Sequence, residues 1–248
     1  MILSGKMISK VSLTIALLWS AALFHIYAET PQMVDIKPFG QGYVIAYSDG
    51  RICFADVEKH ITDSIRLKTE IAGIEVKDDN VLAVTPDGMV YKAERKGKSR
   101  RLCRSRINGN ADRVVGIAST KENTLILTEG GVIFSTRDFD SFTTMDFNGT
   151  YYSYYDETLF CSIAASDNSF FIAGTYMNGK PAVFTSATGK IWSERTLTYT
   201  ENGQTLQLEL QPVRLSYDGS HDRFVLVCTD GWLFYMPGCS HCNSLTRE

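Results

Sequence analysis

The chain has 248 residues, of which 44% are hydrophobic and 21% are charged, and its formal net charge is −3. This hydrophobic content is sufficient for a packed core, and no segment has the composition of a disordered chain. The mild acidic excess argues against a general nucleic-acid-binding protein, because such proteins need a basic surface.

The first 28 residues resemble a secretory signal peptide. Lys6 and Lys10 make a basic start, the apolar run from Val11 to Tyr27 contains no acidic residue, and the small residue Ala28 follows. We therefore expect a secreted or periplasmic protein, with cleavage after Ala28. A membrane anchor is the alternative, because the run is about as long as a weak transmembrane helix. No later stretch could span a bilayer, and the expected mature chain, 29–248, has a net charge of −5, since residues 1–28 contain two Lys and no acid.

A short pattern recurs five times after this segment: an apolar, β-rich run enters a tight glycine turn and a second apolar run leaves it. The copies are VIAYSDGRICF (from Val44), VLAVTPDGMVY (from Val81), LILTEGGVIF (from Leu125), FFIAGTYMNGKPAVF (from Phe170) and FVLVCTDGWLFY (from Phe224). The turn glycines Gly50, Gly88, Gly131, Gly179 and Gly231 are 38, 43, 48 and 52 residues apart. Two more strand-like runs flank each copy, so each unit predicts a four-stranded meander.

A period of about 40–50 residues with four strands per repeat is typical of a β-propeller. We expect an all-β, single-domain propeller of about five four-stranded antiparallel blades, covering residues 31–68, 69–106, 110–148, 157–200 and 209–246. A β-sandwich is the alternative, but its strands would not repeat in groups of four. The later, longer loops are where we expect a binding surface, at one end of the propeller axis.

The segment FTSATGKIW, from Phe184 to Trp192, resembles the Asp-box, or bacterial neuraminidase repeat, whose pattern is Ser-x-Asp-x-Gly-x-Thr-Trp. Gly189 and Trp192 have its spacing, and Ser186 and Thr188 fit if one residue is deleted before Gly189. A second copy, STRDFDSF, begins at Ser135. There Ser135, Ser141 and Phe142 fit, whereas Arg137 and Phe139 replace the Asp and the Gly.

The resemblance implies the fold of the sialidase-like β-propeller superfamily, with the box as a structural hairpin away from the active site. Sialidases of that superfamily need an arginine cluster, a Tyr–Glu nucleophile pair, an acidic proton donor and an Arg-Ile-Pro motif. Here the corresponding region is Asp35-Ile36-Lys37-Pro38, without an Arg, and no arginine matches the cluster. We therefore expect a non-catalytic member, with no catalytic residue, metal site or cofactor.

The densest aromatic stretch is TYYSYY, from Thr150 to Tyr155, in the link between the third and fourth units. Tyr151, Tyr152, Tyr154 and Tyr155 are candidates for a ligand or partner surface, because tyrosines stack on sugar rings and anchor protein partners. The alternative is that alternate tyrosines pack into the interface between blades.

A basic hairpin stands out in this acidic protein. Its basic residues are Lys92, Arg95, Lys96, Lys98, Arg100, Arg101, Arg104 and Arg106. It is either a surface for an anionic glycan or membrane or a solvated outer hairpin that discourages edge-to-edge pairing of strands.

All six cysteines follow the predicted signal peptide. Cys53, Cys161 and Cys228 fall in apolar runs, where free thiols and disulfides are both expected. Cys239 and Cys242 form a Cys-x-x-Cys motif that suggests a disulfide pinning the C-terminal strand, or a redox pair.

The sequence thus predicts an exported binding or scaffold protein that engages a protein or carbohydrate partner through loops at one end of the axis. A glycan-active hydrolase and a thiol-redox protein that uses Cys239 and Cys242 are the alternatives.

Overall fold

The computed structural model describes residues 31–77, 79–96, 99–107, 112–237 and 244–247. Within these ranges the regular structure is β apart from one short helix, α2 (Phe147–Tyr151), and one 3-10 turn, η1 (Thr229–Gly231). No helix of these ranges is long and apolar enough to cross a membrane. The predicted signal peptide and the pair Cys239 and Cys242 lie outside the described residues.

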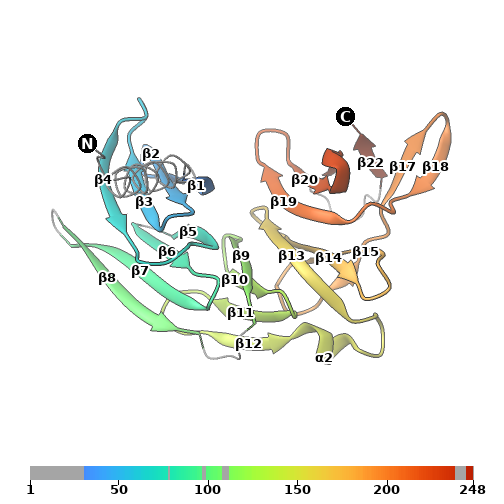
Figure 1. The fold of residues 1–248 in the computed structure, drawn as a ribbon, viewed down its shortest axis with the longest axis horizontal. Helices are drawn as coiled ribbons and strands as arrows, with labels where there is room; N and C mark the ends of the chain where they lie inside the picture. The colour runs from blue at the N-terminus through green and yellow to red at the C-terminus, as the bar shows by residue number, and fades with distance from the viewer. Residues whose placement is uncertain (1–30, 78, 97–98, 108–111, 238–243, 248) are drawn as a thin grey trace, which may run out of the picture. The chain divides into compact units, whose positions relative to one another are not determined.

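The strands form five antiparallel sheets in chain order, which are the blades of a β-propeller (Figure 1). The first two blades consist of β1 (Met33–Phe39), β2 (Gly42–Tyr47), β3 (Arg51–Ala55) and β4 (Ile61–Arg66), then β5 (Gly73–Lys77), β6 (Asn80–Val84), β7 (Met89–Lys96) and β8 (Ser99–Arg106). The next two consist of β9 (Val114–Ser119), β10 (Thr124–Thr128), β11 (Val132–Thr136) and β12 (Thr143–Asp146), then β13 (Thr158–Ala165), β14 (Phe170–Tyr176), β15 (Pro181–Ser186) and β16 (Ser193–Glu194). The fifth consists of β19 (Pro212–Asp218), β20 (Arg223–Cys228), β21 (Leu233–Pro237) and β22 (Ser244–Arg247). The predicted five-bladed, all-β fold is confirmed.

The five repeated turns connect the second and third strands of the blades. Their glycines, Gly50, Gly88, Gly131, Gly179 and Gly231, all have positive φ, between +78° and +90°. In the first three blades the glycine carbonyl also accepts a hydrogen bond from the residue after the fourth strand. The donors are the N–H groups of Leu67, Ile107 and Phe147, at 2.8, 3.2 and 2.9 Å. All three side chains are buried, so this bond fixes the chain where it leaves one blade for the next.

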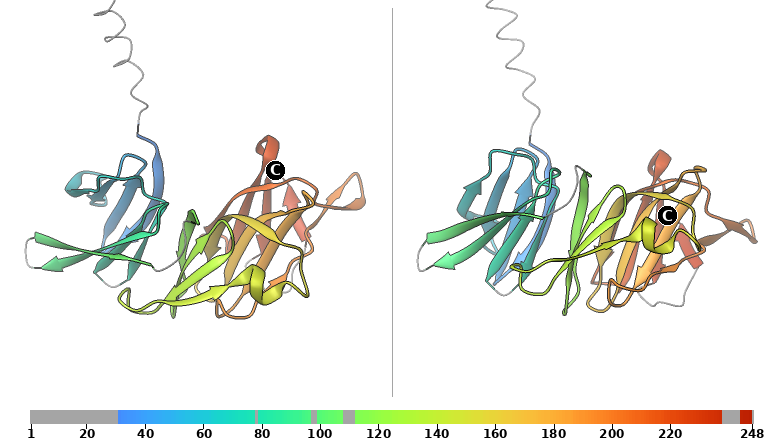
Figure 2. Two further views of the ribbon diagram at one scale, coloured as in Figure 1. Left: turned by 60° about the horizontal axis from the view of Figure 1, so that its bottom comes forward. Right: turned by 90° about the horizontal axis from the view of Figure 1, so that it is seen from below.

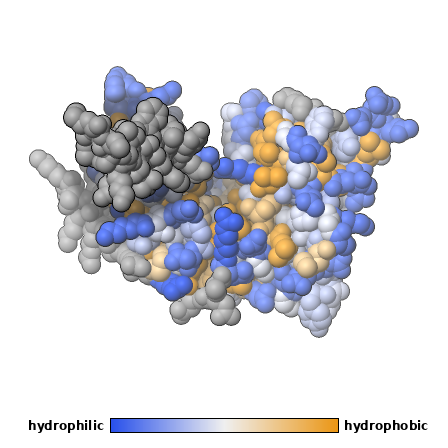
Figure 3. Space-filling model, viewed as in Figure 1, coloured by the Kyte–Doolittle hydropathy of each residue, from blue (hydrophilic) through white to orange (hydrophobic). Residues whose placement is uncertain are grey.

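The core lies between the blades. The first strands of the blades pack side by side in the order β1, β5, β9, β13 and β19 (Figures 1 and 2). A buried cluster fills each of the four junctions between consecutive blades. At the junction of the last two, the rings of Phe171 and Phe224 lie 4.1 Å apart. Between the fifth and first blades, Arg214 Nη2 donates to the carbonyl of Val34 at 3.0 Å. On the face shown in Figure 3 hydrophilic residues cover much of the surface, with hydrophobic residues exposed among them.

The end of the fourth blade differs from the expected layout. We expected the fourth blade to extend to residue 200, but its last strand, β16, ends at Glu194. The chain then forms a hairpin, β17 (Thr198–Glu201) and β18 (Gln204–Gln207), and β17 pairs in parallel with β22. The fifth sheet is thereby extended to six strands. The reason is Leu197, which is buried among side chains of the fourth and fifth blades and leads the chain away from the fourth.

Cys53, Cys161 and Cys228 are free thiols. Cys53 and Cys228 are buried and Cys161 is partly buried. We expected either free thiols or disulfides at these three cysteines, and the free thiol is observed.

Candidate functional site

The two segments that resemble the Asp-box form hairpins with the same hydrogen bonds. In the fourth blade, Ser186 Oγ accepts from the N–H groups of Gly189 at 2.8 Å and Thr188 at 3.3 Å. In the third blade, Thr136 Oγ1 accepts from Phe139 at 3.0 Å and Asp138 at 3.4 Å. The first hydroxyl of each hairpin therefore closes the same turn.

This equivalence shifts the alignment of the third-blade segment by one residue. Thr136, Asp138 and Phe139 occupy the places of Ser186, Thr188 and Gly189, where we had expected Ser135 and Arg137 as the first two. Phe139 (φ +64°) adopts the left-handed conformation of Gly189 (φ +76°).

The remaining candidate residues of the two hairpins have structural contacts. Ser135 Oγ accepts from Asn123 Nδ2 at 2.7 Å, and Ser141 donates to Asp138 through both its N–H and its hydroxyl. Phe142 packs against the cluster between the second and third blades. Trp192 is buried, and its Nε1–H donates to the carbonyl of Gly189 at 3.2 Å. These contacts hold the two hairpins against the body of the protein.

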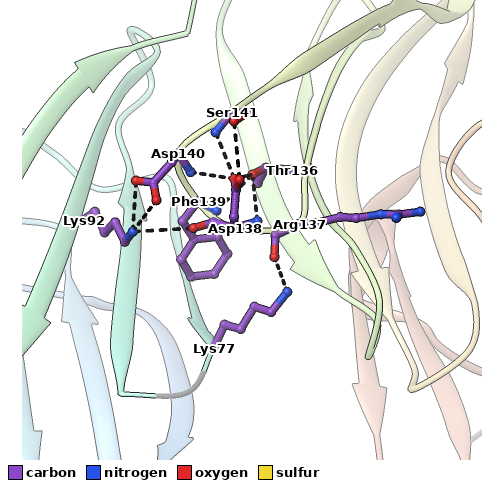
Figure 4. Close-up of polar contacts among 8 residues, drawn as sticks. All are labelled: Lys77, Lys92, Thr136, Arg137, Asp138, Phe139, Asp140 and Ser141. Carbon is purple, nitrogen blue, oxygen red and sulfur yellow. Dashed lines mark hydrogen bonds and ion pairs between the residues drawn. The ribbon is translucent and has the colours of Figure 1, made fainter.

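The third-blade hairpin is also tied to the second blade (Figure 4). Lys92 Nζ lies 2.9 Å from both carboxylate oxygens of Asp140, and Lys77 Nζ donates to the carbonyl of Arg137. N–H donors from Ser141 and Asp140 lower the pKa of Asp138 to about 2, because they stabilise its charged form. The carboxylate of Asp138 therefore makes its hydrogen bonds within the loop itself.

A groove of about 820 Å³ lies beside these two hairpins. Three of its lining residues are basic and three are acidic: Lys121, Arg137, Lys190, Glu122, Asp138 and Asp167. Lys121 and Asp167 form an ion pair of 2.6 Å. The groove has no aromatic residue in its lining and a balanced charge.

The tyrosine-rich link divides into two pairs. Tyr151 and Tyr155 pack inward against Phe147, with ring centroids 4.9 and 6.4 Å from it. Their hydroxyls accept from the backbone N–H groups of Trp192 at 2.8 Å and Glu194 at 3.3 Å. Tyr152 and Tyr154 point to solvent and are 79% and 78% exposed. The packing interpretation therefore applies to Tyr151 and Tyr155, whereas Tyr152 and Tyr154 stay candidates for a ligand or partner surface.

Local structure fixes this division. Asp146 caps α2 by accepting from the N–H of Gly149 at 3.0 Å, and Phe147 at the start of the helix is 1% exposed. The N–H groups of Tyr154 and Tyr155 both donate to the carbonyl of Tyr151. The exposed tyrosines thus extend from a segment whose neighbouring side chains are anchored in the core.

The exposed tyrosines form one wall of a groove of about 690 Å³, called here the tyrosine groove. Its lining residues come from the link, the β14–β15 turn, β16 and the segment before β19, and they are Tyr152, Ser153, Tyr154, Tyr155, Asp156, Tyr176, Asn178, Gly179, Lys180, Pro181, Glu194, Gln207, Leu208 and Glu209. Thr158 is paired with Tyr176, so the link and the β14–β15 turn meet at the same end of the blade. The turn is one of the five repeated glycine turns, and the groove therefore lies at their end of the blades.

The polar groups of the tyrosine groove are mainly acceptors and acids. Tyr176 donates its hydroxyl hydrogen to Glu194 Oε1 at 2.7 Å, and Asn178 Nδ2 donates to Asp156 Oδ2 at 3.1 Å. Burial, together with the hydrogen bond to Glu194 and its charge, raises the pKa of Tyr176 well above its usual range. Three carboxylates, those of Asp156, Glu194 and Glu209, face one base, Lys180.

Sequence reasoning found the tyrosines of this groove but not Tyr176, Glu194 or Glu209. Tyr176 stands three residues before the turn glycine Gly179. This position could have placed Tyr176 near the link, because the glycine turns of a propeller lie at the same end of the blades as the links between blades. Glu209 had no comparable signal, since it follows the unforeseen β17–β18 hairpin. Within the described ranges, no group of three or more His, Cys, Asp and Glu side chains is arranged to bind a metal ion.

No family model and no curated protein matches the chain. Solved structures with a similar fold include a chain of a mitotic checkpoint complex (11% identity, TM-score 0.59), the WD40 domain of Neurospora crassa Pan2 (8% identity, TM-score 0.57) and the Dos1 propeller (11% identity, TM-score 0.56). The matches cover 89%, 87% and 83% of this chain and 64%, 65% and 55% of those chains, so the protein spans less than two thirds of their length. At these identities the likeness shows the fold alone, and that fold is a β-propeller whose structural neighbours include a WD40 domain.

Proposed function

We propose that the protein is a non-catalytic binding protein and that it engages a protein partner through the tyrosine groove. The observation that supports this most directly is the exposure of Tyr152 and Tyr154 beside the carboxylates of Asp156, Glu194 and Glu209. Exposed tyrosines on an anchored backbone lose little conformational entropy on binding, and tyrosine is enriched in the residues that dominate interface energetics.

The charge of the tyrosine groove indicates what the partner presents. Its carboxylates outnumber its single lysine by two, and aromatic faces attract cations through their quadrupole. An Arg- or Lys-containing segment fits both features, because its charge meets the carboxylates while its stem and guanidinium pack on the rings. We therefore propose a basic peptide segment of a partner protein as the ligand.

Export and the Asp-box relationship belong to the same proposal. The features of residues 1–28 support export through a signal peptide, so we place the partner in the extracellular space or in the periplasm. The matching hydrogen bonds at Ser186 and Thr136 support Asp-box hairpins and a sialidase-like ancestry.

The test is binding of a fluorescent peptide of alternating Arg and Ser, measured by anisotropy, with a Glu–Ser peptide as the negative ligand. We expect the Tyr152→Ala/Tyr154→Ala variant to bind at least 10-fold more weakly, because each anchor truncation costs about 1 kcal/mol or more. Tyr43→Ala is the matched control, since Tyr43 is an exposed tyrosine of the first blade. Equal affinity of both variants would reject the tyrosine groove as the site. Selective binding of neutral oligosaccharides instead of the basic peptide would favour a glycan partner.

Glycan hydrolysis is a second candidate, because a tyrosine hydroxyl hydrogen-bonded to a glutamate, as in Tyr176 and Glu194, is a nucleophile–base arrangement. Against it, the pKa of Tyr176 is raised, which disfavours the phenolate, and the tyrosine groove has no arginine in its lining to bind a substrate carboxylate. Release of a fluorescent leaving group from aryl glycosides that is abolished in Tyr176→Phe would establish this activity.

A further inference from the structure

We infer that a second copy of this chain is a partner of the tyrosine groove, and that the segment it inserts is its own β7–β8 hairpin. The inference rests on the proposed function, since it names the basic segment that the tyrosine groove receives. The basic segment is residues 89–106, which form the β7–β8 hairpin.

These residues concentrate positive charge to an unusual degree. They contain eight of the 25 Lys and Arg residues and only one acid, Glu94, so the segment has a net charge of +7. The whole chain has a net charge of −3, and the remaining residues together therefore have −10. A chain divided in this way attracts a second copy of itself wherever its basic and acidic surfaces can meet.

The hairpin extends beyond the body of its blade (Figures 1 and 2). β7 and β8 have eight residues each, but β6 pairs with β7 only from Val84↔Val90 to Val81↔Ala93. The pairs Glu94↔Arg101, Arg95↔Arg100 and Lys96↔Ser99 therefore form a two-stranded ribbon with no third strand beside β7. A two-stranded ribbon of this kind is only marginally stable by itself in water.

Residues of like charge occupy facing register positions in this ribbon. Arg95 is directly opposite Arg100 in the register, and a like-charged pair at that position destabilises a hairpin. Anionic groups of a partner would remove this repulsion. At the base of the hairpin such neutralisation already occurs within the chain, because Lys92 contacts the carboxylate of Asp140.

The tyrosine groove supplies the complementary surface. It combines an excess of carboxylates with exposed aromatic rings, and an Arg-rich ribbon offers the guanidinium groups that pair with both. The hairpin belongs to the second blade and the tyrosine groove to the fourth, so the contact joins two different surfaces. Such a contact builds rings or open chains, or a symmetric pair where each copy inserts its hairpin into the groove of the other.

The experiment is sedimentation velocity of the purified full-length chain over a range of concentrations, at low and at moderate ionic strength. The hairpin variant is Arg95→Ser/Arg100→Ser/Arg101→Ser, and the groove variant is Tyr152→Ala/Tyr154→Ala/Glu209→Gln. We expect the wild type to associate in a concentration-dependent manner, at least 10-fold more weakly at the higher salt, because exposed ion pairs are screened. Each variant alone is expected to sediment as a monomer, with folding checked by its thermal transition.

The decisive sample is an equimolar mixture of the two variants. The intact hairpin of the groove variant can enter the intact groove of the hairpin variant, so we expect a 1:1 heterodimer that grows no further. A mixture that stays monomeric while the wild type associates would place the association on another surface and overturn the inference. A monomeric wild type would also overturn it.

The peptide experiment separates this inference from the proposed function. If the Arg–Ser peptide binds the tyrosine groove but the wild type stays monomeric, the proposed function stands and the inference fails. If the wild type associates, the groove variant associates equally and the peptide does not bind, both fail. Binding of the hairpin to heparin or anionic vesicles, with no self-association, would identify a polyanion as its partner and overturn the inference.

Discussion

Lys37 on β1 and Glu75 on β5 form an ion pair of 2.6 Å that joins the first two blades. The side chain of Glu75 is 8% exposed and that of Lys37 is 28% exposed. Burial raises the pKa of Glu75 despite the attraction of Lys37. Burial lowers the pKa of Lys37, but the charges of Glu75 and Asp35 outweigh this effect and the pKa is raised overall. The pair therefore places a buried carboxyl group directly against the ammonium group of Lys37 at the junction of the first two blades.

Lys37→Met is expected to lower the free energy of unfolding at pH 7 by about 3 kcal/mol, because it leaves the buried carboxylate of Glu75 without its partner. The measurement is urea denaturation followed by tryptophan fluorescence. A carboxyl group whose folded-state pKa is raised destabilises the fold progressively as the pH rises from its unfolded-state pKa to the raised value, and this penalty is absent below the unfolded-state pKa. The deficit of the variant should therefore shrink as the pH is lowered.

The double variant Lys37→Met/Glu75→Met is the control for this prediction. It removes both charges together, so we expect a smaller loss than for Lys37→Met alone. If the single variant unfolds at the wild-type urea concentration, the ion pair does not stabilise the junction.

Gly189→Ala is expected to destabilise the protein more than Gly179→Ala. Both glycines have positive φ, +76° and +86°, which costs an alanine about 1 kcal/mol. A Cβ at Gly179 would meet nothing within 4 Å, whereas a Cβ at Gly189 would lie 2.6 Å from Cδ1 of the buried Leu125. We expect about 1 kcal/mol for Gly179→Ala and about 2–3 kcal/mol for Gly189→Ala, because the Leu125 side chain must move within a close-packed core.

Thermal unfolding of the two variants gives the comparison directly. The conformational cost is shared, so the difference between them reports the contact with Leu125. Equal losses would show that the core beside the fourth-blade hairpin yields to a methyl group at no cost.

Some elements of this structure could be predicted from the sequence, and others could not. The blades were predictable because glycine marks the turns, and each of the five turn glycines has the positive φ that selects it. The third-blade hairpin was misaligned at its first two positions because the neighbours Ser135 and Thr136 both offer a hydroxyl, and only the folded turn shows that Thr136 closes it. The β17–β18 hairpin was not foreseen, because its polar residues, such as Thr200 and Gln204, show no alternation with a buried face.

The tyrosine groove was predictable only in part for a related reason. The density of tyrosines in the link was visible in the sequence, but their division into an inward and an outward pair depends on Phe147 and Trp192, which come from different blades. Contacts between blades are set by how the sheets stack, and no local pattern encodes them.

Asp138→Asn should change the dependence of stability on pH. The folded-state pKa of Asp138 is about 2, whereas an aspartate of an unfolded chain titrates near about 3.9. A carboxyl group with a lowered folded-state pKa stabilises the fold above its unfolded-state pKa, and this contribution is lost as the pH falls toward 2. The difference in stability between wild type and variant should therefore be largest at neutral pH and decrease between about pH 4 and pH 2.

Urea midpoints at pH 7, 5, 4, 3 and 2.5 test this prediction. Asp63→Asn on β4 is the control, because it makes the same substitution at an exposed strand position, where the carboxylate accepts from the N–H of Ser64. A constant difference between wild type and Asp138→Asn across this range would mean that the loop binds the neutral side chain as well as the charged one.

Cys161 and Cys228 are expected to resist thiol reagents in the folded protein. Burial raises the pKa of Cys161 to about 11 and that of Cys228 to about 12. The thiolate is the reactive form, and a free cysteine has a pKa of about 8.5, so at pH 8 both should react about 100-fold or more slowly than an exposed cysteine. The measurement is iodoacetamide labelling at pH 8, with each site quantified by peptide mass spectrometry, in native buffer and again in urea. Rapid labelling of Cys161 in native buffer would show that β13 and β19 separate readily at the junction between the fourth and fifth blades, since Cys161 Sγ lies 3.3 Å from the carbonyl of Pro212 across that junction.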